Sequence, residues 1–432
     1  MQYADLFKSK RVSMDEIVRE VKSGDNVYVH PGGATPLHLL RAFSEYAREN
    51  LQDIDIYHIL TFGQLDYMDP SFEGRVRHTA WFAGGNTRKA INEGRAQWVP
   101  VFLGEVPQLI YKRQVELDVV IIQVSPPDEH GFCSLGVGVD MTLAAVRMGK
   151  KVIAEVNPRQ PRSLGDSFVH LSKIHKLVEV EHELDEMQSG EIGDVHRAVA
   201  RHISGLVEDG DCMQMGIGAI PDATWLEIAD RRDLGIHTEM FSDGAIDLLE
   251  KGVINGERKN LHQGKIVASF VLGSTRCYDY LHNNPLIEMH PTEYCNNPFI
   301  IQQNDNMVAV NSCLQIDLTG QVVSDNIGSR VYSGFGGQVD FIRGAAASKN
   351  GRPIIAFLST GKGGSLSRIV SEHPQGYGIT TTRADIHWVA TEYGIVDLWG
   401  KTRRQRARAL IDLAHPDYRE GLQEDAIKLG LI

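Results

Sequence analysis

The sequence predicts an α/β fold built from two tandem, similar domains with mostly parallel sheets, and three observations favour this class. Short apolar runs alternate with helical patterns along the chain, as in proteins whose strands are joined by helical crossovers. The length of 432 residues exceeds what one hydrophobic core usually supports. Segments of the first half also resemble segments of the second half, and they occur in the same order.

The first half contains two helix starts and five strand candidates. Ser13 and Glu16 have the spacing of a capping box, which predicts an amphipathic helix that continues to about Lys22. Thr35 and Pro36 predict the start of a second helix, because proline is tolerated in a first turn. Apolar runs predict strands over residues 26–30, 55–60, 99–103, 119–124 and 152–156.

The second half continues the same alternation. Residues 212–215 predict a strand, and a helix is expected over 222–229. Polar and apolar residues alternate over 235–241, which predicts a further strand with His237 and Glu239 on one face. The basic stretch that begins at Lys401 predicts the start of the last helix, with a solvated charged face.

The internal resemblance divides the chain into two halves, 1–190 and 191–432. The offset between matching segments grows only slowly along the chain, so we interpret the pattern as an ancient duplication; two independent α/β domains with similar turn chemistry are the alternative. The matching pairs are residues 24–36 with 210–221, 139–145 with 339–345, and 152–154 with 354–356.

Composition excludes several classes of protein. The 44 Lys+Arg against 56 Asp+Glu give a net charge of −12, which argues against a nucleic-acid binder. The five cysteines include no C-x-x-C pair, so a disulfide framework and a cysteine zinc site are disfavoured and a reducing compartment is favoured. No apolar run approaches the roughly 20 residues of a membrane helix, and no signal-peptide pattern opens the sequence. We therefore expect a cytoplasmic protein without nucleic-acid or membrane partners.

Glu239 is the most informative polar residue, because an ionised carboxylate inside an apolar strand is costly to desolvate. One interpretation pairs it with a neighbouring cation. A second makes Glu239 and His237 metal ligands, although no further ligands complete the set by spacing and the P-C-x-x-C of zinc deaminases is absent. A third makes Glu239 a nucleophile or acid–base group, since a glutamate is ionised at neutral pH and needs no activating base.

Three glycine-rich turns are candidates for ligand contact. Gly216 and Gly218 lie between a predicted strand and helix, where backbone N–H groups can approach an anion, although plain turn chemistry is an alternative. Gly32 and Gly33 are the first-half counterpart, which is either the same device or a structural relic. The third turn contains Gly336 and Gly337, and its register disfavours a nicotinamide site.

The lysine of a further glycine-rich stretch has two interpretations. Residues 359–365 fail the Walker A spacing, so ATP chemistry is disfavoured. Lys362, between glycines, is a candidate phosphate ligand or an ordinary flexible-turn lysine.

Four motifs together resemble the family I CoA-transferases. They are Gly216 to Pro221, Ile236 to Gly244 around Glu239, Tyr294 to Pro298, and Gly336 to Phe341. The resemblance covers nearly the whole chain, and it is nearest to the branch of 4-hydroxybutyrate CoA-transferases, butyryl-CoA:acetate CoA-transferases and acetyl-CoA hydrolase/transferases. This family has two tandem α/β domains and shares its fold with sugar-phosphate isomerases.

The resemblance implies a role for each motif. Glu239 would form a glutamyl-CoA thioester, and the tetrahedral oxyanions would be stabilised by Asn296 and by Gly336 or Gly337. The residues expected to contact CoA are Gln214, Met215, Gly216, Ile217, Gly218, Ala219, Gly337, Gln338 and Lys362. Arg343 and Arg368 are further candidates for the CoA phosphates.

The expected activity is the ATP-independent transfer of CoA between an acyl-CoA, of acetyl or butyryl type, and a short-chain carboxylate such as 4-hydroxybutyrate or butyrate. Acyl-CoA hydrolysis through the same intermediate is the alternative within the enzyme class. A non-catalytic protein that binds CoA or a sugar phosphate is the alternative outside it. We expect no metal and no tightly bound cofactor, coenzyme A and acyl-CoA as substrates, and a homodimer or larger homo-oligomer.

Overall fold

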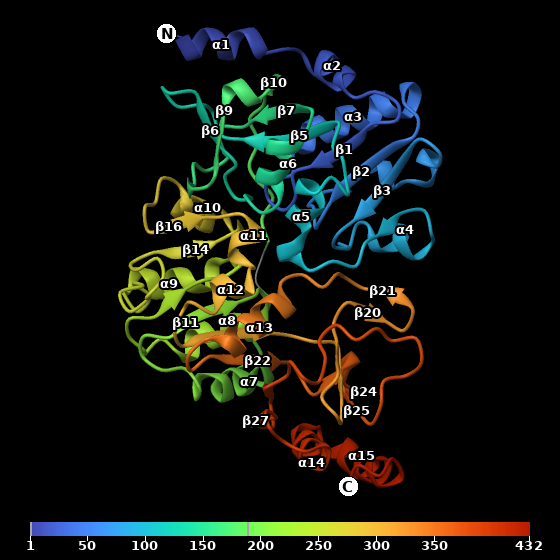
Figure 1. Cartoon of the computed structure of the whole chain (residues 1–432), viewed down its shortest axis with the longest axis vertical. Coiled ribbons are helices and arrows are strands. Elements are labelled where there is room, and N and C mark those ends of the chain that lie inside the picture. Colours follow the sequence, from blue (N-terminus) through green and yellow to red (C-terminus); the bar gives the residue numbers. More distant parts are fainter. Residues whose placement is uncertain (1, 188–189) are drawn as a thin grey trace. The chain divides into compact units, whose positions relative to one another are not determined.

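The computed structural model describes residues 2–187 and 190–432 and has the predicted α/β architecture with mostly parallel sheets (Figure 1). The chain forms two compact units. The first unit ends its main segment at Met187 and also contains Glu239–Phe241 and Val267–Cys295, and the second unit contains the remaining described residues. The first crossing between the units thus lies close to the predicted boundary at residue 190, while two short segments of the second half belong to the first unit.

The first unit is built on a seven-stranded parallel sheet with the strand order β10-β7-β5-β1-β2-β3-β4. Its interior strand β5 is buried along its whole length, as its predominantly apolar sequence requires. The strands are β1 (Asn26–Val29), β2 (Ile54–His58), β3 (Val76–Ala80), β4 (Gln97–Trp98), β5 (Val119–Val124), β7 (Lys151–Val156) and β10 (Lys176–Glu179).

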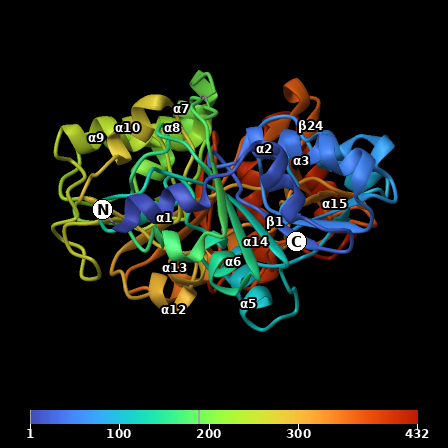
Figure 2. The same cartoon turned by 90° about the horizontal axis from the view of Figure 1, so that it is seen from above.

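Helices α1 to α6 of the first unit precede or connect these strands, and α10 and α11 belong to its later segment, Val267–Cys295. In this unit α2 and α3 lie side by side, with apolar residues of both in one core cluster (Figure 2). The helices are α1 (Gln2–Lys10), α2 (Met14–Ile17), α3 (Leu37–Asn50), α4 (Arg88–Asn92), α5 (Val106–Tyr111), α6 (Thr142–Met148), α10 (Thr275–Leu281) and α11 (Thr292–Cys295).

The second unit is built on a six-stranded sheet with the order β12-β11-β17-β22-β26-β27, in which only the edge strand β27 is antiparallel. Its strands are β11 (Cys212–Met215), β12 (Gly235–Ile236), β17 (Met307–Asn311), β22 (Arg352–Ala356), β26 (Trp388–Thr391) and β27 (Gly394–Asp397). Its helices are α7 (Asp194–Ser204), α8 (Ala219–Glu227), α9 (Ile246–Glu250), α12 (Pro298–Ile301), α13 (Gln338–Ala347), α14 (Arg403–Leu413) and α15 (Pro416–Lys428).

Short strands form the smaller sheets. β6 (Phe132–Ser134) pairs with β9 (Phe168–His170), and β13 (Met240–Phe241) pairs with β15 (Phe270–Val271). The remaining short strands are β8 (Leu164–Gly165), β14 (Ile266–Ala268), β16 (Ile287–Met289), β18 (Gln315–Asp317), β19 (Val322–Val323), β20 (Asn326–Ile327), β21 (Arg330–Val331), β23 (Thr360–Gly361), β24 (Leu366–Ser367) and β25 (Ile369–Val370).

The two main sheets share a strand order. In the first unit β2-β1-β5-β7-β10 run side by side, and in the second unit β12-β11-β17-β22-β26 follow the same sequence of neighbours, all parallel. The repeated segments fall on corresponding elements, since residues 24–36 contain β1 and residues 210–221 contain β11. The common order supports the duplication hypothesis.

Two predicted elements of the first half differ from the structure. Ser13 caps a helix as expected, because its Oγ accepts a hydrogen bond from the Glu16 N–H at 3.2 Å, but α2 ends at Ile17 and continues only as a 3₁₀ turn to Glu20. The predicted strand over 99–103 is wrong. The observed strand β4 ends at Trp98, and the nearby Pro100 has no N–H group with which to continue the ladder.

The last predicted helix is in fact the last but one, since α15 follows α14. Each of the five cysteines is buried with a free thiol. Among the described residues, no helix combines the length and the apolar character needed to span a bilayer.

Candidate active site

The turn after β11 has a conformation that depends on glycine. Gly218 lies immediately before α8 with φ +112° and ψ 177°, a region that side chains with a Cβ essentially never occupy. No heavy atom lies within 4 Å of the position that a Cβ would take on Gly216 or Gly218. The backbone of this turn is therefore open to close approach by a ligand at the N-terminal end of α8.

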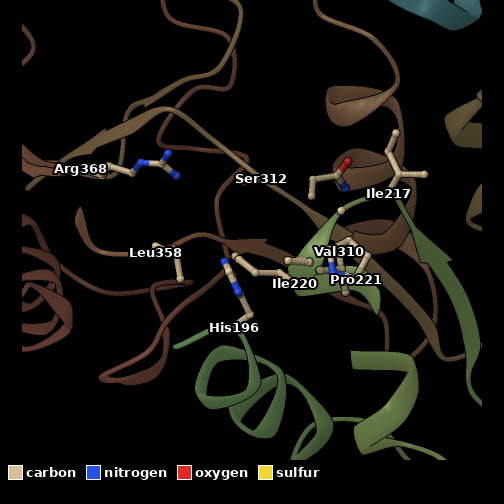
Figure 3. A pocket seen from close by; sticks show the side chains of 13 residues that line it. His196, Ile217, Ile220, Pro221, Val310, Ser312, Leu358 and Arg368 are labelled. Atoms are coloured by element: carbon tan, nitrogen blue, oxygen red, sulfur yellow. The ribbon is translucent and has the colours of Figure 1, made fainter. Parts of the chain in front are cut away.

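This turn forms one wall of a cavity of about 340 Å³ in the second unit (Figure 3). The cavity lies at the carboxyl ends of β11, β17 and β22, because its other walls include Val310 to Ser312, Ala356 and Leu358. The chain passes from β11 to β12 on one side and later places β17 on the other side of β11. A ligand at such a topological switch point is the general rule for open parallel sheets.

The six predicted CoA-contacting residues from Gln214 to Ala219 divide into two groups. Gly216, Ile217, Gly218 and Ala219 line it. Gln214 and Met215 are buried in β11, and the Gln214 Oε1 atom accepts a hydrogen bond from Asn311 Nδ2 at 3.0 Å. Gln214 thus holds Asn311, which is itself a lining residue.

The three basic candidates have different environments. Arg368 lines the cavity. Arg343 forms an ion pair with Asp385, with Nε–Oδ1 at 3.0 Å, and Lys362 lies on an exposed turn outside the lining. Of the three, the geometry therefore favours Arg368 as the partner of an anion in this cavity.

Glu239 lies where the predicted strand is interrupted, so the single strand over 235–241 is wrong. β12 pairs with β11 only as far as Ile236, and the His237 N–H still donates to the Met213 carbonyl at 3.1 Å. The chain then bends at Glu239, and β13 pairs with β15 instead. The β12–β11 pairing belongs to the second unit and the β13–β15 pairing to the first. The side chains of residues 235–241 therefore do not alternate between the two faces of a single sheet.

The break gives His237 and Glu239 different environments. His237 is fully buried and packs near the Phe341 ring, with the ring centroids 6.2 Å apart. Glu239 is half-buried, and its carbonyl accepts hydrogen bonds from the N–H groups of Ser269 at 2.9 Å and Phe270 at 3.0 Å. The peptide group that follows Glu239 is therefore held by two backbone hydrogen bonds.

The glycine that follows Glu239 in the same motif is required by packing. A Cβ on Gly244 would lie 2.6 Å from Cδ1 of Trp225 and 2.9 Å from Oδ1 of Asp222, both on α8. Only glycine lets this turn approach α8 so closely.

The predicted oxyanion residues belong to the second unit. Asn296 is completely buried directly after α11. Gly336 has φ +55°, and Gly337 is buried at the N-terminal end of α13. The neighbouring Gln338 donates from Nε2 to Thr381 Oγ1 at 3.1 Å. Gly337 and Gln338 lie outside the lining of the 340 Å³ cavity, and the oxyanion and CoA roles of these residues stay predictions.

The corresponding edge of the first unit is occupied by a buried carboxylate. Glu155 lies near the carboxyl end of β7, the strand that corresponds to β22. Its Oε2 accepts a hydrogen bond from the Leu39 N–H in the first turn of α3 at 2.7 Å. Its Oε1 lies 2.9 Å from His182 Nε2, while His182 Nδ1 lies 2.9 Å from the Glu183 carbonyl. Glu155 therefore occupies the helix end that follows the Gly32–Gly33 turn, so this turn is a structural counterpart of the Gly216–Gly218 turn rather than an open site.

Several lining residues lay outside every sequence motif, among them His196, Asn311 and Ser312. His196 comes from α7, which packs closely against α8 (Figure 2). No local pattern marks it, because its place in the cavity depends on the packing of two helices. Asn311 is the last residue of the parallel strand β17 and Ser312 follows it, so a search of strand ends in the internal repeat could have found them.

The comparisons with known proteins agree with this architecture. The family model of the acetyl-CoA hydrolase/transferase N-terminal domain matches residues 1–187, and that of the C-terminal domain matches residues 273–426. The 4-hydroxybutyrate coenzyme A transferase of Clostridium kluyveri is 45% identical over 98% of this chain and 99% of its own length. The butyryl-CoA:acetate CoA-transferase of Anaerostipes caccae is 36% identical over 99% and 98%.

A solved structure is similarly close. The 4-hydroxybutyrate CoA-transferase of Porphyromonas gingivalis is 38% identical and superposes with a TM-score of 0.86 over 99% of both chains. The chain belongs to the acetyl-CoA hydrolase/transferase family. The predictions of family, fold class and CoA-transferase activity are confirmed.

Proposed function

We propose that this CoA-transferase moves CoA between an acetyl-CoA or butyryl-CoA donor and a short-chain carboxylate, 4-hydroxybutyrate or butyrate, through a glutamyl-CoA thioester on Glu239. The single observation that supports the site most strongly is the cavity at the sheet's switch point, since the predicted CoA turn from Gly216 to Ala219 forms its wall. The named acids are those of similar transferases.

Each half of the proposed reaction consists of two acyl transfers. The Glu239 carboxylate attacks the thioester carbonyl, which gives an acyl-glutamyl anhydride and CoA thiolate. The thiolate attacks the glutamyl carbonyl of the anhydride, so the first acid leaves and glutamyl-CoA remains. The second acid then attacks this thioester and reverses the steps, and no ATP is consumed.

A carboxylate suits this role better than a hydroxyl nucleophile. Its acyl adduct is an anhydride, which is reactive enough to return the acyl group to a thiolate, whereas a serine ester would be too stable. Each tetrahedral intermediate carries an oxyanion, for which we assign the Asn296 amide and the N–H groups of Gly336 and Gly337. A preorganised donor of this kind contributes roughly 3–4 kcal/mol in other acyl-transfer enzymes.

CoA is held in this scheme by residues from three segments. The turn after β11 supplies Gln214, Met215, Gly216, Ile217, Gly218 and Ala219, and Gly337, Gln338 and Lys362 complete the set. Binding of the long CoA chain, remote from the carbonyl, supplies energy for orienting the reacting groups. CoA enters and leaves as part of the substrates, so this route needs no tightly bound cofactor.

Hydrolysis is the competing outcome of the same chemistry, because water can also attack glutamyl-CoA. More distant relatives, such as the 26% identical enzyme of Candida albicans, are named acetyl-CoA hydrolases. We assign transfer as the main activity on the basis of the more similar transferases. The ratio of acid-dependent transfer to hydrolysis in the presence of 4-hydroxybutyrate measures this directly.

The proposed setting of the enzyme is the cytoplasm, as a homodimer or larger homo-oligomer. Five buried free thiols fit a reducing compartment. Light scattering at several protein concentrations would measure the oligomeric state.

Covalent trapping tests the nucleophile. Incubation with acetyl-CoA in the absence of acceptor acid is expected to load CoA onto Glu239, and peptide mass analysis after borohydride reduction should locate the modification there. We expect Glu239→Gln and Glu239→Ala to lower kcat by roughly 10⁴-fold or more, as removal of a covalent nucleophile does elsewhere. Glu424→Gln, on the exposed face of α15, is the matched control and should retain full activity. A modification at another residue would reject the assignment.

A further inference from the structure

Arg368 brings a positive charge to the cavity with its backbone firmly held. It lies between β24 and β25, where its N–H donates to the Ser359 carbonyl at 2.8 Å and its carbonyl accepts from the Ile316 N–H at 2.9 Å. Within residues 2–187 and 190–432, its guanidinium forms no ion pair or side-chain hydrogen bond. Figure 3 shows this guanidinium pointing into the space that the other lining residues enclose.

His196 adds a second hydrogen-bond donor to the same space. Its Nδ1 accepts a hydrogen bond from the Gly193 N–H at 3.0 Å at the start of α7. A neutral imidazole with an accepting Nδ1 carries its proton on Nε2, so Nε2 is a donor. The ring extends from α7 into the cavity (Figure 3). Arg368 and His196 together offer an arrangement suited to a phosphate.

The rest of the cavity is largely apolar. Its wall includes Ile217, Ile220, Pro221, Val310 and Leu358. The volume of about 340 Å³ lies at the lower end of the roughly 300–1,000 Å³ of small-molecule sites, so it suits one end of a CoA molecule rather than the whole. A flat heteroaromatic ring beside a phosphate matches this combination of surfaces better than pantetheine, whose amides carry no charge.

We infer that this cavity binds the phosphorylated adenosine end of acyl-CoA, with a phosphate on Arg368 and His196 and the purine against the apolar wall. The inference rests on the proposed function and assigns the specificity for CoA to two residues outside the glycine turn. The protein carries a net charge of −12, so an anionic substrate requires a local cation of this kind. The acceptor acid is the other possible anion, and the experiments below separate the two.

Steady-state kinetics of three variants test the role of Arg368. Arg368→Ala should raise KM for acyl-CoA by about 10- to 100-fold, the value of one charge-assisted hydrogen bond, and change kcat by less than about twofold. Arg368→Lys should recover part of the loss, because lysine keeps the charge but not the two-pronged geometry. Arg404→Ala, an exposed arginine of α14, is the matched control and should retain the wild-type KM.

Fragments of the substrate identify the group that Arg368 binds. Adenosine 3′,5′-bisphosphate and ADP should bind the wild-type protein in calorimetry and bind Arg368→Ala at least about tenfold more weakly, as expected for a lost charged contact. Pantetheine should inhibit both proteins equally. A rise in KM for acetyl-CoA but not for acetyl-dephospho-CoA would assign the 3′-phosphate, and an equal rise would assign the diphosphate; either result supports the inference.

Two results would overturn the inference. One is an unchanged KM for acyl-CoA in Arg368→Ala, and the other is a raised KM for the acceptor acid alone, which would make this a carboxylate site. Measuring the covalent CoA adduct on Glu239 in the same variant separates the test of the cavity from the test of the nucleophile. Arg368→Ala at saturating acyl-CoA should still load CoA onto Glu239, so loading without nucleotide binding rejects only the cavity assignment. Nucleotide binding that depends on Arg368 without any adduct on Glu239 rejects only the nucleophile.

Discussion

At the scale of single residues, the conformation of Gly218 distinguishes two glycines that look equivalent in the sequence. Gly216 and Gly218 both face open space, but only Gly218 has a backbone conformation closed to other residues, at φ +112°. A methyl group on Gly218 meets no neighbour within the protein, so any effect of its substitution on the free energy of unfolding comes from backbone strain. A comparison of alanine substitutions at Gly216 and Gly218 therefore measures how much the backbone conformation of Gly218 matters for stability and for acyl-CoA binding.

Gly218→Ala should destabilise the protein by about 1–3 kcal/mol, the cost of a residue with a Cβ in this backbone region. It should also raise KM for acyl-CoA, because a relaxed turn moves the N–H groups before α8. Gly216→Ala should change the free energy of unfolding by less than about 0.5 kcal/mol, as surface substitutions usually do. Urea denaturation and steady-state kinetics of both variants measure the difference, and equal effects of the two substitutions would contradict the assigned strain.

Part of the site could be predicted at this scale and part could not. The turn from Gly216 to Ala219 was a candidate because a glycine-rich stretch between strand and helix can bind an anion, and the family resemblance assigned it to CoA. Arg368 was a candidate by charge alone, and only the folded chain distinguishes it from the ion-paired Arg343. His196 has no motif, since its position follows from the packing of α7 on α8.

At the scale of elements, buried parallel strands were the most predictable. β5 and β11 are observed over the predicted residues, because strands buried on both faces are predominantly apolar runs. The strand around Glu239 was predicted wrongly because its second part pairs with β15, a strand distant in sequence. Local alternation describes which face a residue takes in a strand, but it contains no information about which partner the strand will find.

The first turn of α3 depends on an ion pair that responds to pH. Hydrogen bonding to Glu155 raises the pKa of His182, which outweighs the opposing effect of its partial burial. Both ring nitrogens face acceptors, Glu155 Oε1 and the Glu183 carbonyl, so the charged imidazolium satisfies both contacts. The Asp185 carboxylate favours the same charged form, and the His38 ring lies 4.7 Å from the His182 ring, centroid to centroid.

A raised histidine pKa means that the folded state binds the proton more tightly than the unfolded state. The stabilisation is therefore complete below the unfolded pKa of about 6.5 and is lost as pH rises through the higher folded value. We expect the melting temperature of the wild type to fall across this range relative to Glu155→Gln, which removes the partner charge. Glu183→Gln, which leaves the carbonyl contact intact, should retain the wild-type slope, and a flat wild-type profile would contradict the pairing.

At the scale of the whole molecule, the two sheets with a common strand order differ in how their units are completed. The first unit takes in Val267–Cys295 from the second half of the chain. The Ser269 carbonyl accepts from the N–H groups of Val139 at 3.0 Å and Asp140 at 3.3 Å, and the Val271 N–H donates to the Val137 carbonyl at 2.8 Å. Tyr278 also approaches Gly33, whose Cβ position lies 3.0 Å from the tyrosine Oη.

A fragment of residues 1–187 should therefore lack native packing, because these hydrogen bonds and the Tyr278 contact lose their partners. We expect a weak near-ultraviolet circular dichroism signal, binding of a hydrophobic dye and no cooperative urea transition, in contrast to the full chain. Addition of a peptide spanning residues 267–295 should increase the near-ultraviolet signal. A fragment that unfolds cooperatively on its own would show that the first unit does not depend on the later segment.

The Glu155 carboxylate at the start of α3 bears on how twin halves diverge. If both descend from one ancestor, each began with the same turn between its first strand and its following helix. In the first half the chain itself now supplies the hydrogen-bond acceptor at that helix end, through the Glu155 side chain. A helix end occupied in this way offers no place for a ligand, and the proposed function accordingly assigns CoA binding to the corresponding turn of the second half.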